Sequence, residues 1–472
     1  MKIRKIAGGF TAAKGFKASS CEAAIKYRNR RDMALLFTDV PCAVAGTFTS
    51  NKVKAAPVLW DMDIVKSGKP VRAVVVNTGI ANAGTGAEGM RLCSETAKHT
   101  AEILDISASE VLVGSTGVIG PNVPLDRITA GVSVMAKNLS DSAEAATLAS
   151  KAIMTTDTVN KEYAVEFDLP AASGEGTVTV HLGGMSKGSG MIHPNMCTML
   201  GYLATDCAID PALLQKALSA VIKDTFNMIT VDGDTSTNDT LLLLSSGLAG
   251  NKPIIADDES YELFCAALFS VSHDLARLMA SDGEGATHLI ETRVLNADTK
   301  ENARTLARSV VGSSLVKAMI YGKDANCGRV LCALGYAGPD FNPADITITM
   351  TGESGSVCFY KDGCVQLFDE DKALEILSEH DVHFDCDMNM GKEEATAFGC
   401  DLTYDYVKIN GEIVAKSEAI FTSYNEWHDS IIDSFSYNAG DTLEVGIHVE
   451  CAGEGNGAWG KIDDALLNSV SK

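Results

Sequence analysis

The sequence predicts a layered α+β protein, and three observations predict it. Segments with the two-residue alternation of a strand and segments with helical spacing are mixed along the 472 residues. Two strand-like segments, 164–167 and 177–182, flank Gly174-Glu-Gly and predict an antiparallel hairpin. Hydrophobic residues make up 46% of the chain and charged residues 21%, which is the balance of a folded protein, and the length is comfortable for two domains.

The expected elements follow one another along the whole chain. Each strand is an apolar or alternating run, and each helix has apolar residues three and four positions apart. The apolar run headed by Thr198 is expected to begin a strand or a helix. The predicted strands are 71–76, 110–113, 164–167, 177–182, 288–295, 346–350 and 357–360. The predicted helices are 88–104, 125–152 (mostly helical), 211–224, 261–281 and 302–321.

Charge and cysteine content narrow the function classes. The net charge of −23 argues against nucleic-acid binding, and the densest basic cluster, residues 26–31, is expected to be a solvated surface. The 13 cysteines include no C-x-x-C pair, and Cys327 and Cys332 lack histidines at zinc-site spacing, so reduced thiols and no metal are expected. No signal peptide and no run of 18 apolar residues are found, which predicts a cytoplasmic protein without a membrane span.

The segment 184–201 is the most informative part of the chain. A glycine-rich stretch containing Lys187 runs into His193-Pro and then into the apolar run that Thr198 heads. A hydroxyl in this place is a candidate nucleophile. If the Cys197–Thr198 bond breaks, Thr198 gains an α-amine beside its own hydroxyl, which is a self-contained base and nucleophile. An ordinary helix cap at Thr198 is the alternative.

Other polar segments suggest the rest of a site. Thr116 and Gly117, between a predicted strand and a proline-bearing turn, offer a hydroxyl and close backbone approach for an oxyanion, with a plain turn as the alternative. Hydroxyls and carboxylates also crowd three loops, and helix caps and turns are the alternative there. Glu284 is expected to accept hydrogen bonds from an ammonium group and Lys187 to hold a carboxylate. These loops are 154–159, 231–240 and 282–287.

Two further patterns carry less weight. Gly84-Thr-Gly-Ala-Glu-Gly has the spacing of a dinucleotide-binding loop, but it follows the predicted strand 71–76 only after a long loop, so nucleotide binding is the weaker hypothesis. Residues 391–399 and 452–460 form a weak internal repeat, which is either chance or a duplicated strand–loop unit.

Long motifs resemble a known family. Lys187-Gly-Ser-Gly-Met-Ile-His-Pro-Asn-Met-Cys-Thr-Met-Leu is similar to the processing-site motif of the ornithine acetyltransferase / glutamate N-acetyltransferase family of arginine biosynthesis. The resemblance extends from the N-terminus to about residue 412. Further matching stretches are 9–17, 49–58, 114–120, 155–158, 232–240, 322–329 and 399–410.

This resemblance implies the two-domain, self-processing fold of that acyltransferase type, with a threonine nucleophile. It implies cleavage between Cys197 and Thr198, an α chain 1–197, a β-chain core 198–412 and an α2β2 heterotetramer. The implied nucleophile is Thr198. The implied oxyanion hole is Thr116 and Gly117, and the implied substrate-binding residues are Thr155, Lys187, Thr198, Glu284 and Asn410.

The implied reaction moves an acetyl group from N2-acetyl-L-ornithine to L-glutamate through an acetyl-threonine, with ping-pong kinetics. No cofactor is required, and acetyl-CoA is allowed as a second acetyl donor. The alternative enzymatic function is that of a self-processing amidase or aminopeptidase. The non-catalytic alternative is a homologue whose C-terminal tail blocks the pocket. An amino-acid site with Lys187 and Glu284 favours free amino acids over peptides.

Two positions and the C-terminal segment depart from the family pattern. Cys197 stands where alanine is common, which places a thiol beside the scissile bond, although His193 is the only histidine near it in sequence. Ala415 stands where a serine or threonine is usual, and residues 413–472 follow as an atypical extension. Because the chain end helps line the family's pocket, the extension leaves Asn410 the least secure of the implied ligands. An interaction module, a duplicated strand pair and a chimeric end are the alternatives for it.

Overall fold

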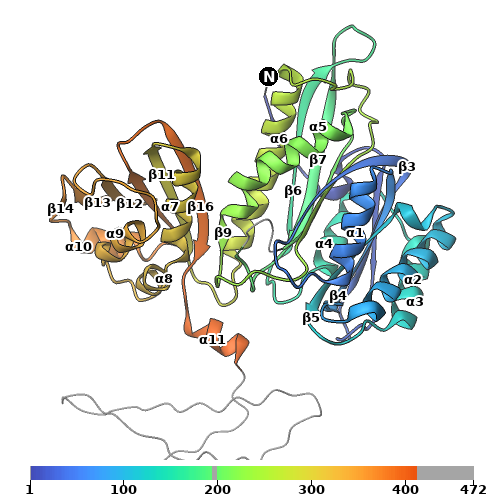
Figure 1. Ribbon diagram of the computed structural model, residues 1–472, viewed down its shortest axis with the longest axis horizontal. Helices are drawn as coiled ribbons and strands as arrows, with labels where there is room; N and C mark the ends of the chain where they lie inside the picture. Colours follow the sequence, from blue (N-terminus) through green and yellow to red (C-terminus); the bar gives the residue numbers. More distant parts are fainter. Residues whose placement is uncertain (1, 194–198, 412–472) are drawn as a thin grey trace, which may run out of the picture. The chain divides into compact units, whose positions relative to one another are not determined.

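The computed structural model describes residues 2–193 and 199–411 (Figure 1). The chain forms two compact units, residues 1–406 and 407–472. The predicted bond of cleavage and the extension 413–472 lie outside the described residues. Strands and helices alternate through the first unit, so the predicted layered α+β class is confirmed.

The strands begin and end at the following residues: β1 Arg4–Ile6, β2 Phe16–Cys21, β3 Met33–Phe48, β4 Val71–Ile80, β5 Val111–Val118, β6 Lys161–Pro170, β7 Thr177–Lys187, β8 Leu200–Thr205, β9 Ile229–Thr230, β10 Thr240–Ser245, β11 Leu289–Ala297, β12 Thr347–Gly352, β13 Gly355–Lys361, β14 Cys364–Val365, β15 Asp381–Asp387 and β16 Glu393–Cys400.

The α-helices are α1 Ala56–Ser67, α2 Gly86–Leu104, α3 Leu125–Lys137, α4 Ala143–Ala152, α5 Pro211–Val221, α6 Glu259–Ser281, α7 Lys300–Gly312, α8 Ser314–Tyr321, α9 Cys327–Gly335, α10 Glu370–Ile376 and α11 Tyr404–Asn410. Short 3-10 turns lie at Phe10–Ala12, Ala108–Glu110, Ile222–Asp224 and Phe226–Met228.

The first sheet has nine strands in the order β1-β6-β7-β8-β10-β3-β4-β5, and β2 pairs with β3 beside this path. β8 runs antiparallel to β7 and parallel to β10, so Lys187, Leu200 and Thr240 lie in one row across three strands. Strands from both sides of the predicted cut therefore share this sheet.

The second sheet has seven strands in the order β14-β13-β12-β15-β11-β16-β9. α7 packs along β11 and β16 (Figure 1). The cluster between this sheet and its helices is apolar, and Phe359, Phe384 and Met350 are fully buried in it. Burying each large apolar side chain contributes roughly 1.5–3 kcal/mol relative to leaving it exposed.

α6 lies along β6 and β7 and buries Phe264, Leu268 and Leu275 in the core of the first sheet (Figure 1). Among the described helices it is the one long and apolar enough to cross a membrane by length and composition. Its hydropathy follows from this packing, because half of the apolar window is buried inside the unit.

Several sequence predictions need correction at their boundaries. The helix predicted over 125–152 is two helices, because α3 ends at Lys137 and the Ser142 side chain caps a new helix by accepting a hydrogen bond from the Ala145 amide. The helix predicted over 302–321 breaks in the same way at Ser313, which caps α8. The ends of strands, by contrast, are set by pairing with strands that are distant in the sequence. β4 runs on to Ile80, beyond the end expected near Asn77.

β5 runs through Gly114–Gly117, which the sequence predicts as a turn, because it pairs in parallel with β4. Gly114 breaks the strand pattern for a packing reason, since a Cβ there would lie 2.1 Å from the Tyr202 hydroxyl.

Candidate active site

The candidate site lies where β7, β8 and β10 share one row of the first sheet. Met199, the first described residue after the predicted cut, is buried, and its carbonyl accepts a hydrogen bond from the Thr240 amide at 2.8 Å. Cys197 and Thr198 lie outside the described residues, so cleavage and the nucleophile stay predictions. Met199 marks where the chain enters the sheet beside Lys187 and Asp239.

Lys187 ends β7 and is 8% exposed. Its Nζ lies 3.9 Å from Asp157 Oδ2, and no hydrogen bond of this ammonium to another described residue is recorded. Burial lowers the pKa of Lys187, and the negative charges of Asp157, Asp239 and Glu284 oppose that shift. A buried ammonium with donors to offer suits an anionic group of a small ligand.

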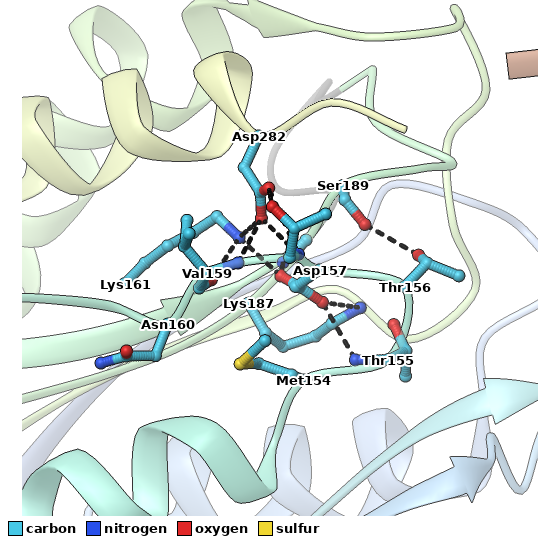
Figure 2. A network of polar contacts seen from close by, with 12 residues as sticks. Met154, Thr155, Thr156, Asp157, Val159, Asn160, Lys161, Lys187, Ser189 and Asp282 are labelled. Atoms are coloured by element: carbon cyan, nitrogen blue, oxygen red, sulfur yellow. Dashed lines mark hydrogen bonds and ion pairs between the residues drawn. The ribbon is translucent and has the colours of Figure 1, made fainter. Parts of the chain in front are cut away.

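A polar network holds the neighbouring loop (Figure 2). Asp157 accepts hydrogen bonds from the Thr155 amide at 3.0 Å, the Gly188 amide at 2.7 Å and Lys161 Nζ at 2.7 Å. The ammonium of Lys161 is also 2.5 Å from Asp282 Oδ2. Burial opposes the charged form of Asp157, but the charges of Lys187 and Lys161 win and lower its pKa. The network fixes Thr155 and Lys187 relative to each other.

Glu284 is brought to the same place by the turn after α6. Its amide donates to the Ser189 carbonyl at 2.8 Å. A Cβ on Gly190 would lie 2.3–2.5 Å from the Glu284 carboxyl group, so the glycine at this position lets the carboxylate approach the loop after β7. Of the predicted substrate residues, the structure therefore gathers Thr155, Lys187 and Glu284. Asn410 is the last residue of α11 and belongs to the second unit, so it is not grouped with these three residues.

Thr116 and Gly117 lie at the end of β5, the edge strand. Gly117 has φ +127°, and a Cβ there would lie 2.2 Å from the carbonyl carbon of Gly79, so only glycine fits. Asn238 joins this strand end to β10: its side-chain amide donates to the Ser115 carbonyl at 2.8 Å and to the Ala81 carbonyl at 2.6 Å. The sequence predictions did not single out Asn238.

Asp239, the next residue, was also missed as a single position, although the loop that contains it was predicted to be functional. It is 2% exposed, and its Oδ2 has no hydrogen-bond partner within the described part of the chain. Burial raises its pKa well above the usual value, and hydrogen bonding from Ser236, Thr49 and the Met199 amide and the charge of Lys187 offset only part of that rise. This buried carboxyl group lies beside Met199, just before β8 begins.

The segment leading to the predicted cut is held by Asp232. Its carboxylate accepts hydrogen bonds from the Met191 amide at 2.6 Å, the Ile192 amide at 2.9 Å and the Tyr406 hydroxyl at 3.2 Å. Met191 has φ +53°, an uncommon conformation for a residue with a side chain. His193 Nδ1 lies 3.0 Å from Thr230 Oγ1, and burial lowers its pKa. The segment is therefore anchored as far as His193.

The structure gives the glycines of the dinucleotide-like pattern a local explanation. β4, the following loop and α2 have the expected strand–loop–helix order. However, Gly89 lies inside α2, and a Cβ there would clash with Thr85 Oγ1 at 2.1 Å and Asn82 Oδ1 at 2.7 Å. Packing of Thr85 and Asn82 over the helix requires this glycine. Across residues 2–193 and 199–411, no group of three metal-ligating side chains is found.

Comparison with known proteins extends the geometric picture. The ArgJ family model matches residues 17–414. The arginine biosynthesis bifunctional protein ArgJ of Symbiobacterium thermophilum is 49% identical over 408 residues, which cover 86% of this chain and 98% of that protein. Its counterpart in Caldanaerobacter subterraneus is 45% identical over 404 residues, with coverages of 86% and 98%.

Solved structures match in part. The ArgJ structure from Bacillus halodurans is 42% identical and covers 45% of this chain and 98% of that chain, with a TM-score of 0.42. The ornithine acetyltransferase from Mycobacterium tuberculosis, solved in complex with ornithine, is 39% identical and covers 42% of this chain and 100% of that chain, with a TM-score of 0.37.

The protein is thus an enzyme of the acyltransferase class. More closely, the chain belongs to the ArgJ family of arginine biosynthesis, and its last 58 residues, 415–472, lie beyond the family match.

Proposed function

We propose that the protein transfers the acetyl group of N2-acetyl-L-ornithine to L-glutamate, producing L-ornithine and N-acetyl-L-glutamate. The observation that carries this proposal is the buried ammonium of Lys187 within electrostatic reach of the Glu284 carboxylate, close to where Met199 leads into the first sheet. An ammonium and a carboxylate so placed complement the α-carboxylate and an ammonium group of a free amino acid. The ornithine complex of the Mycobacterium tuberculosis relative supports this ligand class.

Self-cleavage comes first in the proposed sequence. Thr198 Oγ attacks the Cys197 carbonyl carbon, the peptide nitrogen leaves as the α-amine of Thr198, and water hydrolyses the resulting ester. The α-amine has an ordinary pKa of about 7.7–8.0, so it serves as a general base near neutral pH. The anchoring of residues 191 and 192 by Asp232 supports this step, because it restrains the chain just before the bond.

Acetyl transfer then follows a ping-pong course. Thr198 Oγ attacks the acetyl carbon of acetylornithine, Thr116 and Gly117 stabilise the oxyanion, and ornithine leaves with a proton. Glutamate enters the same pocket, its amine attacks the acetyl-threonine ester, and the hydroxyl is regenerated. Lys187 binds the α-carboxylate of each amino acid in turn. The substrate roles of Thr155 and Asn410 belong to this proposal.

The proposed enzyme is cytoplasmic, needs no cofactor and assembles as an α2β2 heterotetramer of its cleaved chains. Acetyl-CoA is proposed as an alternative acetyl donor, and glutamate acetylation with acetyl-CoA alone tests that point. Size-exclusion chromatography with light scattering tests the assembly.

A denaturing gel with N-terminal sequencing tests the nucleophile. Two fragments are expected, the second beginning Thr-Met-Leu-Gly, and Thr198→Ala should give one full-length band. Normal cleavage of Thr198→Ala would contradict the mechanism. Acetyl exchange between acetylornithine and glutamate without coenzyme A tests the reaction, and cleaved protein that hydrolyses amides without such exchange would favour the amidase alternative.

A further inference from the structure

Asp157 lies at the centre of the polar network, where its contacts are with other groups of the protein. Its side chain is fully buried, and each oxygen is occupied. Oδ1 accepts from Lys161 Nζ and the Gly188 amide, both at 2.7 Å. Oδ2 accepts from the Thr155 amide at 3.0 Å and faces Lys187 Nζ at 3.9 Å (Figure 2). This carboxylate is therefore a partner of the protein itself.

The two lysines that share Asp157 have different surroundings. Lys161 is 0% exposed, and its three donors are used by Asp157, by the Val159 carbonyl at 3.2 Å and by Asp282 at 2.5 Å. Lys187 keeps an ion pair with Asp157 and no recorded hydrogen bond from Nζ to the rest of the described chain. Lys161 is structural, whereas Lys187 has donors left for a ligand.

The charge on Lys187 depends on its neighbours. Burial and the nearby Lys161 charge both lower the pKa of Lys187. Asp157, Asp239 and Glu284 oppose that shift, and Asp157 is the strongest of the three. Burial raises the pKa of Asp239 well above its usual value, whereas Asp157 lies within ion-pair distance of Lys187, at 3.9 Å. Asp157 is therefore the main counterion of Lys187.

We propose that Asp157 is a positioning residue for substrate binding: it keeps Lys187 charged and directed at the carboxylate of the bound amino acid, while touching no substrate atom. The inference rests on the proposed acetyl exchange, in which Lys187 binds that carboxylate.

The sign of the expected pH effect follows from the charges around Lys187. The charged groups that act on it are Asp157 in the loop before β6, Glu284 after α6, Asp239 before β10 and Lys161 in β6. Removing the Asp157 charge lowers the pKa of Lys187 further. Substrate binding should then be lost at a lower pH, because the neutral amine cannot pair with a carboxylate.

The test compares Asp157→Asn with Asp282→Asn in cleaved protein. For acetylornithine, kcat/KM is measured from pH 6 to 10. Asp157→Asn should move the alkaline limb at least about one pH unit lower, the size of effect a close opposite charge has. It should act through KM and leave kcat near the wild-type value. Asp282→Asn removes the other carboxylate on Lys161 but no recorded partner of Lys187, so it should lower stability and leave the alkaline limb in place.

Two outcomes overturn the inference: an unshifted limb in Asp157→Asn, or equal shifts in both variants. Lys187→Arg decides the question even if Asp157→Asn does not fold, because arginine stays charged over this range. Its alkaline limb should be absent, and a persisting limb would overturn the inference. Wild-type protein without acetyl exchange would instead refute the proposed function.

Discussion

The two sheets of the first unit differ in what they bury. The second sheet packs against its helices through an apolar cluster, whereas the first sheet also encloses charged side chains close to the candidate site. Those charged residues are Asp157, Lys161, Lys187, Asp239 and Asp282. Buried charge is costly unless it is paired, so a group of five such side chains marks this region as a candidate binding site.

The largest expected effect contrasts two buried lysines. Lys161→Met leaves Asp157 and Asp282 without their shared partner and should lower the free energy of unfolding by about 3–5 kcal/mol. Lys317, beside the second sheet, donates to the Cys400 carbonyl, and no ion pair is recorded for it among the described residues. Lys317→Met should cost about 1 kcal/mol. If urea unfolding showed equal losses of unfolding free energy in Lys161→Met and Lys317→Met, the predicted difference between the two buried lysines would be wrong.

A change in the apolar cluster should separate stability from activity. Phe384, fully buried in β15, contacts no residue of the candidate site in the described network. Phe384→Ala should lower the free energy of unfolding by about 3–5 kcal/mol through the cavity it leaves. Acetyl exchange at a temperature where the variant is folded should keep the wild-type kcat. A large loss of kcat in folded Phe384→Ala would give the second sheet a direct part in the reaction.

Glycines at the end of β5 test the predicted oxyanion hole. Gly117→Ala forces a Cβ into the backbone of Gly79 and displaces this strand end, so kcat for acetyl exchange should fall by about 10²–10³, the loss typical of one missing oxyanion donor. Gly120→Ala is the matched control: its φ is also positive, at +109°, but no atom lies within 4 Å of the added Cβ. Similar losses in the two variants would show that backbone strain alone is responsible.

The smallest effect concerns pH. His181 in β7 has its pKa raised, chiefly by the hydrogen bond between its Nδ1 and Asp206 at 2.9 Å. Because the folded pKa is raised above the ordinary 6.5, the histidine's contribution to stability is complete below about pH 6.5 and is lost as pH rises through the folded value.

The difference in unfolding free energy between wild type and His181→Gln should therefore shrink from pH 6 to pH 8.5 in urea titrations. His380→Gln serves as the control, since its pair with Asp381 on the second sheet is exposed and contributes little. A difference for His181→Gln that stays constant with pH would contradict the assignment.

Local pattern predicts much of this fold, and its failures have physical causes. The strand at 71–76, the helix at 88–104 and the hairpin after 164 are found because apolar periodicity is strong there. β5 was predicted too short because Gly114 looks like a turn residue, and only contact with Tyr202 explains it. β3, 16 residues long, was not predicted; its two halves pair with different strands.

In the candidate site, too, local sequence patterns predict some residues and miss those that depend on distant partners. Thr155, Lys187 and Glu284 were predicted as a group and lie together, although their substrate roles remain predictions. Lys161 was passed over because a lysine at the start of a strand usually faces solvent. Its burial depends on Asp282, 121 residues away, and Asn238 depends in the same way on Ser115. Such long-range partners leave no local signal in one sequence.

The alternation of strands across residue 198 has a consequence for the life of the enzyme. β7 and β8 are neighbours in one sheet, yet the proposed cleavage would place them on different polypeptides. The intact chain assembles this sheet in an intramolecular reaction, whereas the processed pair, once denatured, must find each other again in solution. The proposed cleavage would therefore turn recovery from unfolding into a concentration-dependent encounter, so that the cleaved enzyme would depend on slow unfolding more than on renaturation.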